Sequence, residues 1–274
     1  MSRSFRRARA LALAGLFAAC TALAGAQTLR VGSDVSYAPL EFYAAGTHAM
    51  IGFDIDLAEA LGQKMGEQVS IANHTFDDLI PAVQKGTFDF AISALSDTRA
   101  REAKVDFIDY LLAGSGMLVP SGNPHSIFDI AGLCGLRVTV QRGTSQEGAL
   151  QEQSKRCVEL NLAPIKLLEH STDEGAFKQF AAGNADVHVT DYPVVAYLAK
   201  TNDHKYVVAG RQFSLVPYGI AVSKNDPALR ARLIQALQGV IADGTYDRLL
   251  KKWGLEQGAL RSAPLNAGTL FNSK

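Results

Sequence analysis

The sequence has little of what metal centres and nucleic-acid-binding surfaces need. Its 274 residues include three cysteines and one tryptophan, and no block of like charges suggests a nucleic-acid or anionic-membrane surface. The cysteine spacings fit no zinc motif, and the histidines are scattered without a pair four residues apart: His48, His74, His125, His170, His188 and His204. We therefore expect no metal, no cofactor and no nucleic-acid partner.

The first 26 residues are typical of a secretory signal peptide. Four arginines precede an uncharged stretch rich in Ala and Leu, and Ala24-Gly25-Ala26 supplies a small-x-small cleavage site. This apolar stretch is too short and too rich in Ala for a membrane span. In an alternative interpretation Cys20 is the lipid-modified first residue of a lipoprotein, but Phe17 stands where such signals usually carry Leu. The pattern favours export to the periplasm as a soluble protein.

Removal of this leader changes both the charge and the cysteine count. The whole chain has 27 basic and 27 acidic residues, and loss of the four arginines gives a net charge of about −4. Cys134 and Cys157 remain as an even pair in an oxidising compartment. We expect them to form a disulfide worth about 3 kcal/mol, with two free buried thiols as the alternative.

Strand-like and helix-like segments alternate through most of the mature chain, which predicts an α/β fold with parallel sheets. In the first series we expect strands at 28–33, 69–72 and 88–92, and helices at 53–65 and 76–85. In the second series we expect strands at 136–140, 165–168, 186–190 and 206–208, and helices at 147–156, 173–182 and 192–199. Each series predicts a doubly wound unit, and roughly 250 residues suffice for two modest domains.

Two apolar crossings join the series and predict hinges near 113–116 and 212–216. Two helices expected at 227–242 and 246–253 have no sheet of their own, so we expect them to return to the first lobe. This organisation assigns 27–113 together with 215–274 to lobe 1, and 114–214 to lobe 2. It leaves 259–274 as a poorly ordered tail.

The segment from Gly86 to Tyr110 predicts one wall of a site for a small carboxylate. Ser93 and Ser96 follow the expected strand, and Arg101 lies one turn into the next helix. A guanidinium fork, hydroxyls and free amides at a helix start suit a carboxylate. An ordinary strand, a capped helix and a surface arginine would explain the same segment.

Polar residues at other strand ends predict the remaining walls, because ligands of parallel α/β sheets bind beyond the carboxyl ends of strands. In the second series, Gly143 allows a tight turn and leaves the amides of Ser145 and Gln146 free. Asp191 ends a later strand, where it either caps the following helix or binds an ammonium group. Arg101 and Asp191 together match the charges of a zwitterionic α-amino acid.

Several segments in one order give the mature chain a resemblance to the periplasmic polar amino-acid-binding proteins of ABC uptake systems, which include histidine and lysine/arginine/ornithine receptors. These segments are YAPLEF from Tyr37, GFDIDLAEAL from Gly52, SALSDTRAR from Ser93, KVDFIDY from Lys104, VQRGTSQE from Val140 and ADGTYDRLLKKWG from Ala242. The resemblance implies a two-lobe periplasmic binding protein fold, with two doubly wound sheets joined by two hinge crossings. It also implies a monomeric receptor that closes on an amino acid or derivative and delivers it to permease and ATPase subunits.

The resemblance assigns the two ends of the amino acid to opposite lobes. Arg101 resembles the family's carboxylate-binding arginine, helped by Ser96 and by groups near Thr144 and Ser145. Asp191 resembles the carboxylate that holds the ligand's amino group.

The resemblance also assigns residues around the ligand's side chain. Ser93 resembles a polar contact, Tyr37 and Phe76 match the positions that sandwich the side chain, and Asp34 and Gln146 match positions near its end. Asp34 hints at a cationic side chain, although related receptors for neutral ligands also carry an acid there.

The chain departs from the family's pattern at two positions of the expected carboxylate site. Ala94 replaces a second serine, and Asp97 replaces a more usual apolar residue. The cysteine pair also differs from the position of the histidine receptor's disulfide. These departures leave the identity of the ligand open.

Three other functions compete with a receptor. Periplasmic cyclohexadienyl (arogenate) dehydratases resemble these receptors but need an acid that protonates a departing hydroxyl, for which Asp34 and Asp191 are the available cleft carboxylates. A Ser/His/Asp hydrolase would need a nucleophile context such as GxSxG, which the sequence lacks. A membrane-linked sensor would continue into a transmembrane region, whereas we expect a free-standing, non-enzymatic receptor.

Overall fold

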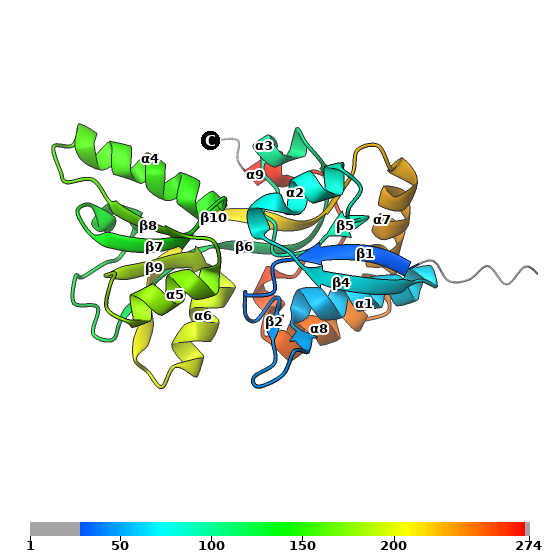
Figure 1. The fold of residues 1–274 in the computed structure, drawn as a ribbon, viewed down its shortest axis with the longest axis horizontal. Coiled ribbons are helices and arrows are strands. Elements are labelled where there is room, and N and C mark those ends of the chain that lie inside the picture. Colours follow the sequence, from blue (N-terminus) through cyan, green and yellow to red (C-terminus); the bar gives the residue numbers. More distant parts are fainter. Residues whose placement is uncertain (1–27, 272–274) are drawn as a thin grey trace, which may run out of the picture.

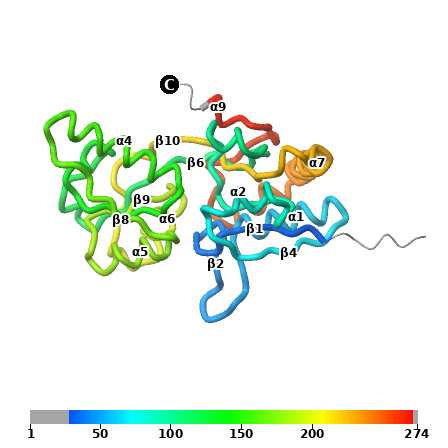
Figure 2. Tube along the Cα trace, turned by 45° about the horizontal axis from the view of Figure 1, so that its top comes forward, coloured from blue at the N-terminus to red at the C-terminus, as the bar shows by residue number. Residues whose placement is uncertain are grey.

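The computed structural model describes residues 28–271, so the expected signal peptide at 1–26, with Cys20, lies outside the described residues. Two groups of α/β elements lie side by side, and two long strands pass from one group to the other (Figure 1; Figure 2). Within residues 28–271 no helix is long and apolar enough to cross a membrane.

The first group holds the amino-terminal elements. These are β1 (Thr28–Ser33), the hairpin β2 (Phe42–Tyr43) and β3 (Met50–Ile51), α1 (Phe53–Met65), β4 (Gln68–Asn73), α2 (Phe76–Gln84), β5 (Phe90–Ala91) and α3 (Arg99–Glu102). Helix α1 buries Leu57 and Leu61 at helical spacing, and it ends at Gly66, whose positive φ of 71° suits glycine.

The second group holds the elements between the two crossings. These are the 3-10 helix η1 (Ile130–Leu133), β7 (Arg137–Gln141), α4 (Ser145–Glu159), β8 (Lys166–His170), α5 (Asp173–Ala181), β9 (Val187–Asp191) and α6 (Tyr192–Thr201). Helix α4 begins two residues before its expected start because the Thr144 hydroxyl accepts a hydrogen bond from the Glu147 amide and caps the helix. The expected disulfide between Cys134 and Cys157 is confirmed, and it joins the end of η1 to α4.

The two crossings are strands rather than loops. β6 (Asp106–Pro120) and β10 (Tyr206–Val222) run antiparallel to each other, and they connect all eight strands in the order β4-β1-β5-β10-β6-β9-β7-β8. The predicted parallel sheets are present as β4-β1-β5 and β9-β7-β8, but each continues into these shared antiparallel strands. β6 is buried over nearly its whole length, as expected of a strand covered on both faces.

The carboxyl-terminal elements lie on the first group. Helices α7 (Pro227–Ala242) and α8 (Thr245–Trp253) share one apolar cluster with α1, β1 and β6, whereas a separate cluster surrounds β7, β9 and α4. The expectation of a poorly ordered tail is wrong for the described residues 259–271. The short helix η2 (Glu256–Gly258) precedes this segment and α9 (Gly268–Phe271) ends it. Between them, Leu265 pairs with Ile108 and Asn266 bonds the backbone of Phe107.

Candidate functional site

A small cavity lies where the two groups of elements meet, and both groups line it. Its lining consists of Asp34, Tyr37, Glu41, Phe76, Ser93, Ala94, Ser96, Gln141, Thr144, Ser145, Gln146 and Asp191. The structure therefore brings together every site residue that the sequence predicted, except Arg101, which lies directly behind Ser96 and Phe76. Glu41 and Gln141 are additional polar residues that the sequence analysis did not select.

Arg101 lies on the short helix α3, where the Thr98 hydroxyl caps the first turn. Its guanidinium donates to the backbone carbonyls of Ser96 at 2.9 Å and Gly143 at 3.0 Å, and it lies 5.3 Å from the centre of the Phe76 ring. No carboxylate within residues 28–271 forms an ion pair with it. The side chain keeps some solvent access, yet burial of the charge lowers its pKa to about 10. Arg101 is thus a cation whose protein partners are neutral.

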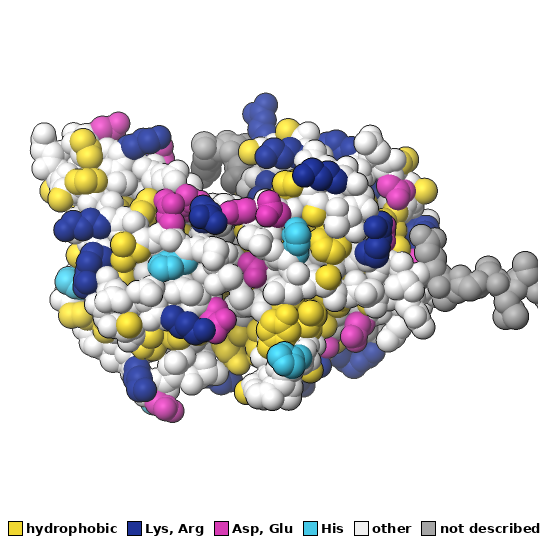
Figure 3. All heavy atoms as spheres, in the orientation of Figure 1, with side chains coloured by type: hydrophobic (Ala, Val, Ile, Leu, Met, Phe, Trp, Pro, Cys, Tyr) yellow, Lys and Arg dark blue, Asp and Glu magenta, His cyan; other side chains and the backbone are white. Residues whose placement is uncertain are grey.

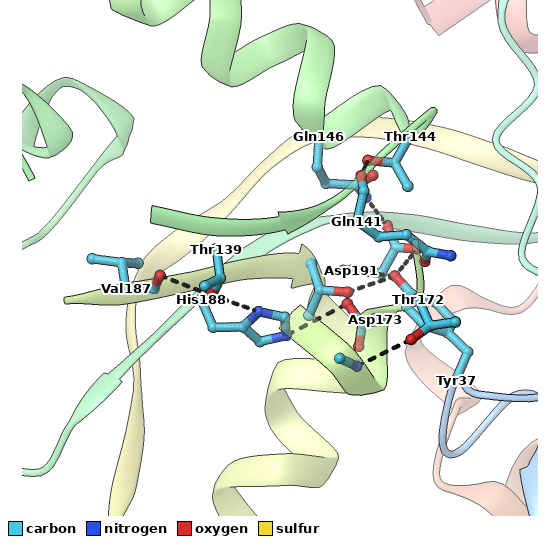
Figure 4. A network of polar contacts seen from close by, with 12 residues as sticks. Tyr37, Thr139, Gln141, Thr144, Gln146, Thr172, Asp173, Val187, His188 and Asp191 are labelled. Carbon is cyan, nitrogen blue, oxygen red and sulfur yellow. Dashed lines mark hydrogen bonds and ion pairs between the residues drawn. The ribbon is translucent and has the colours of Figure 1, made fainter. Parts of the chain in front are cut away.

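Asp191 ends β9 on the opposite side of the cavity and is almost fully buried (Figure 4). Tyr37 donates its hydroxyl to one carboxylate oxygen at 2.7 Å, and the Gln146 amide donates to the other. Burial raises the pKa of Asp191 to about 7, although the hydrogen bond from Tyr37 lowers it. Each oxygen of this carboxyl group thus accepts a hydrogen bond from a side chain of the protein.

A buried acid and a histidine lie behind this wall (Figure 4). His188 Nε2 is 3.4 Å from Asp173 Oδ1, and its Nδ1 is 3.3 Å from the Thr139 hydroxyl. Asp173 raises the pKa of both Asp34 and Asp191 through its negative charge. On the second-group side of the cavity, a further acidic residue, Asp173, therefore lies behind Asp191.

Acidic groups also surround the end of the cavity where the resemblance places the ligand's side chain. Gln141 Nε2 donates to Asp34 Oδ2 at 2.7 Å, and burial raises the pKa of Asp34. Ser93 donates its hydroxyl to Glu41 Oε1 at 2.8 Å, and burial raises the pKa of Glu41 well above its usual range. Sequence signals existed for both missed residues. Glu41 belongs to the YAPLEF segment, and Gln141 ends a strand facing the cavity.

Direct contacts join the two walls. Tyr37 reaches Asp191, Gln141 reaches Asp34, and the hydroxyls of Ser96 and Ser145 are 3.1 Å apart. These bonds hold the two groups together around the cavity.

The two groups also meet at the molecular surface between α2 and α4, along a line that we call the seam. Acidic side chains gather there around a basic one (Figure 3). Arg142 forms an ion pair with Asp77 at 3.0 Å. Gly143 is required beside it, because its φ is +76° and an added Cβ would lie 1.6 Å from an Asp77 oxygen.

The chain is similar to known proteins over nearly all of its described length. The sequence model of the bacterial extracellular solute-binding proteins, family 3, matches residues 29–256. The arginine-binding protein ArgT of Corynebacterium glutamicum is 32% identical, with 89% of this chain and 80% of the relative covered. The histidine-binding periplasmic protein of Salmonella typhimurium is 31% identical, with 90% and 95% covered.

Solved structures of amino-acid-binding proteins are also similar to this chain. An ancestral arginine-binding protein bound to arginine superposes with a TM-score of 0.77 at 35% identity, covering 82% of this chain and 97% of that one. An ancestral amino-acid-binding protein, described as a precursor of cyclohexadienyl dehydratase, gives 0.74 at 38% identity, with 82% and 95% covered.

Proposed function

The chain belongs to the bacterial extracellular solute-binding proteins, family 3, and we propose that it is a periplasmic receptor that captures an amino acid and delivers it to an ABC-transporter permease. The observation that carries this proposal is that Asp191 lines one side of the cavity while Arg101 lies behind Ser96 and Phe76, which line it from the other group. A cation with neutral partners on one side and a buried carboxylate on the other match the two ends of a zwitterion.

In this proposal Arg101 binds the ligand's α-carboxylate, with Ser96 and the hydroxyls and amides of Thr144 and Ser145 beside it. A guanidinium forms two parallel hydrogen bonds to a carboxylate, and such charge-assisted bonds are about twice as strong as neutral ones. Asp191 binds the α-ammonium group, which takes the place of the Tyr37 and Gln146 donors around it. The charged partners of the two ends, Arg101 and Asp191, then belong to different lobes.

The ligand's side chain extends between Tyr37 and Phe76 toward Asp34, Ser93 and Gln146. We propose a cationic side chain, because a positive charge beside Asp34 and Glu41 would offset the burial that raises the pKa of both groups, and Asp173 adds negative charge behind them. Relatives named for arginine binding are consistent with this class.

Ligand binding proceeds by opening and closing around the crossing strands. We propose that lobe 1 consists of 27–113 and 215–274, and that lobe 2 consists of 114–214. Two hydrogen bonds join these lobes, one between Gln141 and Asp34 and one between Tyr37 and Asp191. An amino acid entering the cavity exchanges these bonds for bonds to its own charges. Micromolar affinity requires about −8 kcal/mol, which a desolvated carboxylate–Arg pair, an ammonium–Asp pair and an aromatic sandwich can supply.

The protein acts without catalysis in this proposal, as a monomer exported to the periplasm through its leader. The rival is a dehydratase on the same fold, and one structural neighbour is described as a precursor of such an enzyme. Its acid would have to be one of the carboxyls that line the cavity, Asp34, Glu41 or Asp191. Each of these already accepts a hydrogen bond from a neighbouring side chain.

A thermal-shift screen of the proteinogenic amino acids, ornithine, citrulline and opines, followed by calorimetry, tests the proposal. We expect the basic amino acids to raise the melting temperature most, because a ligand far above its Kd stabilises by several kcal/mol. Parallel incubation with prephenate and arogenate tests the rival. If no amino acid raised the melting temperature and the dehydrated product formed, the receptor proposal would be rejected in favour of the dehydratase.

A further inference from the structure

Residues 259–271 form an ordered segment that we call the C-terminal strap. It lies beyond the part matched by the family's sequence model, which ends at residue 256. The strap lies alongside β6. Ala259 pairs with Leu111, Leu265 pairs with Ile108, and the Asp109 amide donates to the Pro264 carbonyl at 2.9 Å. β9 pairs with β6 only at Ser115–Leu118, so the strap covers an edge of β6 that β9 leaves open.

The end of the strap is anchored by three carboxyl side chains. The Ala267 amide donates to Asp109 at 3.0 Å, the Gly268 amide to Asp97 at 2.8 Å, and the Thr269 amide to Glu102 at 3.2 Å. Helix α9 accordingly lies beside α3 (Figure 1).

Two of these anchors are sequence neighbours of the proposed carboxylate-binding groups. Asp97 directly follows Ser96, and Glu102 directly follows Arg101. The strap therefore grips the binding segment Ser96–Arg101 at both of its ends.

The fit between strap and segment is close. Asp97 is fully buried, and an added Cβ on Gly268 would lie 2.1 Å from the Asp97 carbonyl oxygen. Such an approach admits only glycine without displacing the backbone.

The helix of the binding segment contributes little to holding it. Helix α3 has four residues, none of them buried, and a helix of this length is not stable by itself. The start of the segment is attached to β10, because the Asp97 amide bonds the Pro217 carbonyl at 2.8 Å and Ser96 pairs with Tyr218. At its end, the Arg101 carbonyl accepts from the amide of the buried Val105 at 3.1 Å. The Ser96 hydroxyl and the Arg101 guanidinium also contact Ser145 and Gly143 of the second group.

We propose that the C-terminal strap positions Ser96–Arg101 for the ligand's carboxylate, with Asp97 as the positioning residue. This inference rests on the proposed receptor function. It predicts a loss that depends on the carboxylate of the ligand, because the strap acts only on the groups that bind that end.

Two variants separate the strap from the segment in different ways. Asp97→Ala removes the acceptor of the Gly268 amide, and Gly268→Val forces the strap away while leaving Asp97 unchanged. Asp97→Asn retains an acceptor oxygen and serves as the conservative variant. Arg261→Ala is the matched control, because it removes an exposed ion pair of the strap with Asp247.

Calorimetry with L-arginine and its α-amide, which lacks the carboxylate, supplies the readout. We expect Asp97→Ala and Gly268→Val to weaken L-arginine binding by about tenfold, as for a site whose support is loosened, and to change the amide's affinity by less than about twofold. We expect Asp97→Asn to recover most of the affinity and Arg261→Ala to match the wild type. L-histidine and its amide replace this pair if the wild type does not bind arginine.

Equal losses for acid and amide, or wild-type affinity for L-arginine in both strap variants, would overturn the positioning role while leaving the receptor function intact. A wild type that binds no amino acid in the screen would instead overturn the receptor function, and the positioning role with it.

Discussion

The two walls of the cavity hold their charges in opposite ways. On one wall, Arg101 extends from a four-residue helix and donates only to backbone carbonyls. On the other wall, Asp191 is buried at the end of a strand, where Tyr37 and Gln146 donate to both of its oxygens. The cation is ready for an incoming partner, whereas the anion must exchange partners. Substitutions on the two walls should therefore differ in their effects: both should weaken ligand binding, but only the substitution of Asp191 should also change the stability of the folded protein.

The largest effect is expected for Arg101→Ala. Removing one partner of a desolvated charge pair costs about 2–5 kcal/mol of binding, so the affinity for a basic amino acid should fall at least about 30-fold. Stability should change little, because Arg101 forms no ion pair within the described chain. Calorimetry and thermal unfolding measure the two quantities. Near-native affinity would disprove the assignment of the carboxylate to Arg101.

Asp191→Asn should weaken binding nearly as much, because the ligand's ammonium loses its charged partner. Unlike Arg101→Ala, it should also change the stability, since it removes a buried carboxylate bonded by Tyr37 and Gln146. Thermal unfolding without added ligand distinguishes the two walls. Equal stability effects for the two variants would contradict the contrast between them.

The acidic wall should also depend on pH. Because burial raises the folded-state pKa of Asp191 to about 7, above its unfolded value, this group favours the folded state most at low pH. Its contribution is lost as pH rises through 7, by at most about 1.4 kcal/mol per pH unit. Unfolding titrations between pH 5 and 8 should therefore show a smaller slope in Asp191→Asn than in the wild type. Identical slopes would show that Asp191 is ionised throughout this range.

The smallest effect is expected for Arg142→Ala, which removes the ion pair with Asp77 on the seam between the walls. The Arg142 side chain is about half exposed, so the pair is screened by solvent and contributes less than about 1 kcal/mol. We expect affinity within about threefold of the wild type, measured by calorimetry. A loss as large as that of Arg101→Ala would mean that the seam, rather than the cavity, controls closure.

Local patterns predicted the separate elements well. The bounds of α1 and α7 match their expected ranges, because apolar spacing and flanking residues mark both ends. The expected strand at 206–208 proved to be the start of the long strand β10. Sequence windows around Gly114 and Gly116 resemble a loop, but pairing between β6 and β10 makes the same residues extended.

The site was only partly accessible to sequence reasoning. Strand ends and capping residues indicated Arg101 and Asp191, because their chemistry follows from local position. Glu41 and the C-terminal strap were missed, since neither lies at a strand end of the parallel units. Their proximity to the cavity depends on contacts between segments distant in the chain, such as that between Gly268 and Asp97.

The sequence by itself determined the α/β class, the cysteine pair and the family resemblance, because periodicity, composition and motif order are local properties of the chain. Only the tertiary structure decided that the two sheets share their crossing strands and that the tail returns to the binding segment. Long-range pairing is selected by burial and by satisfaction of backbone hydrogen bonds, which no sequence window contains. Burial and hydrogen bonding between distant segments likewise place Arg101, whose hydrogen-bond partners are neutral, on the other wall from Asp191, whose two oxygens accept hydrogen bonds from Tyr37 and Gln146.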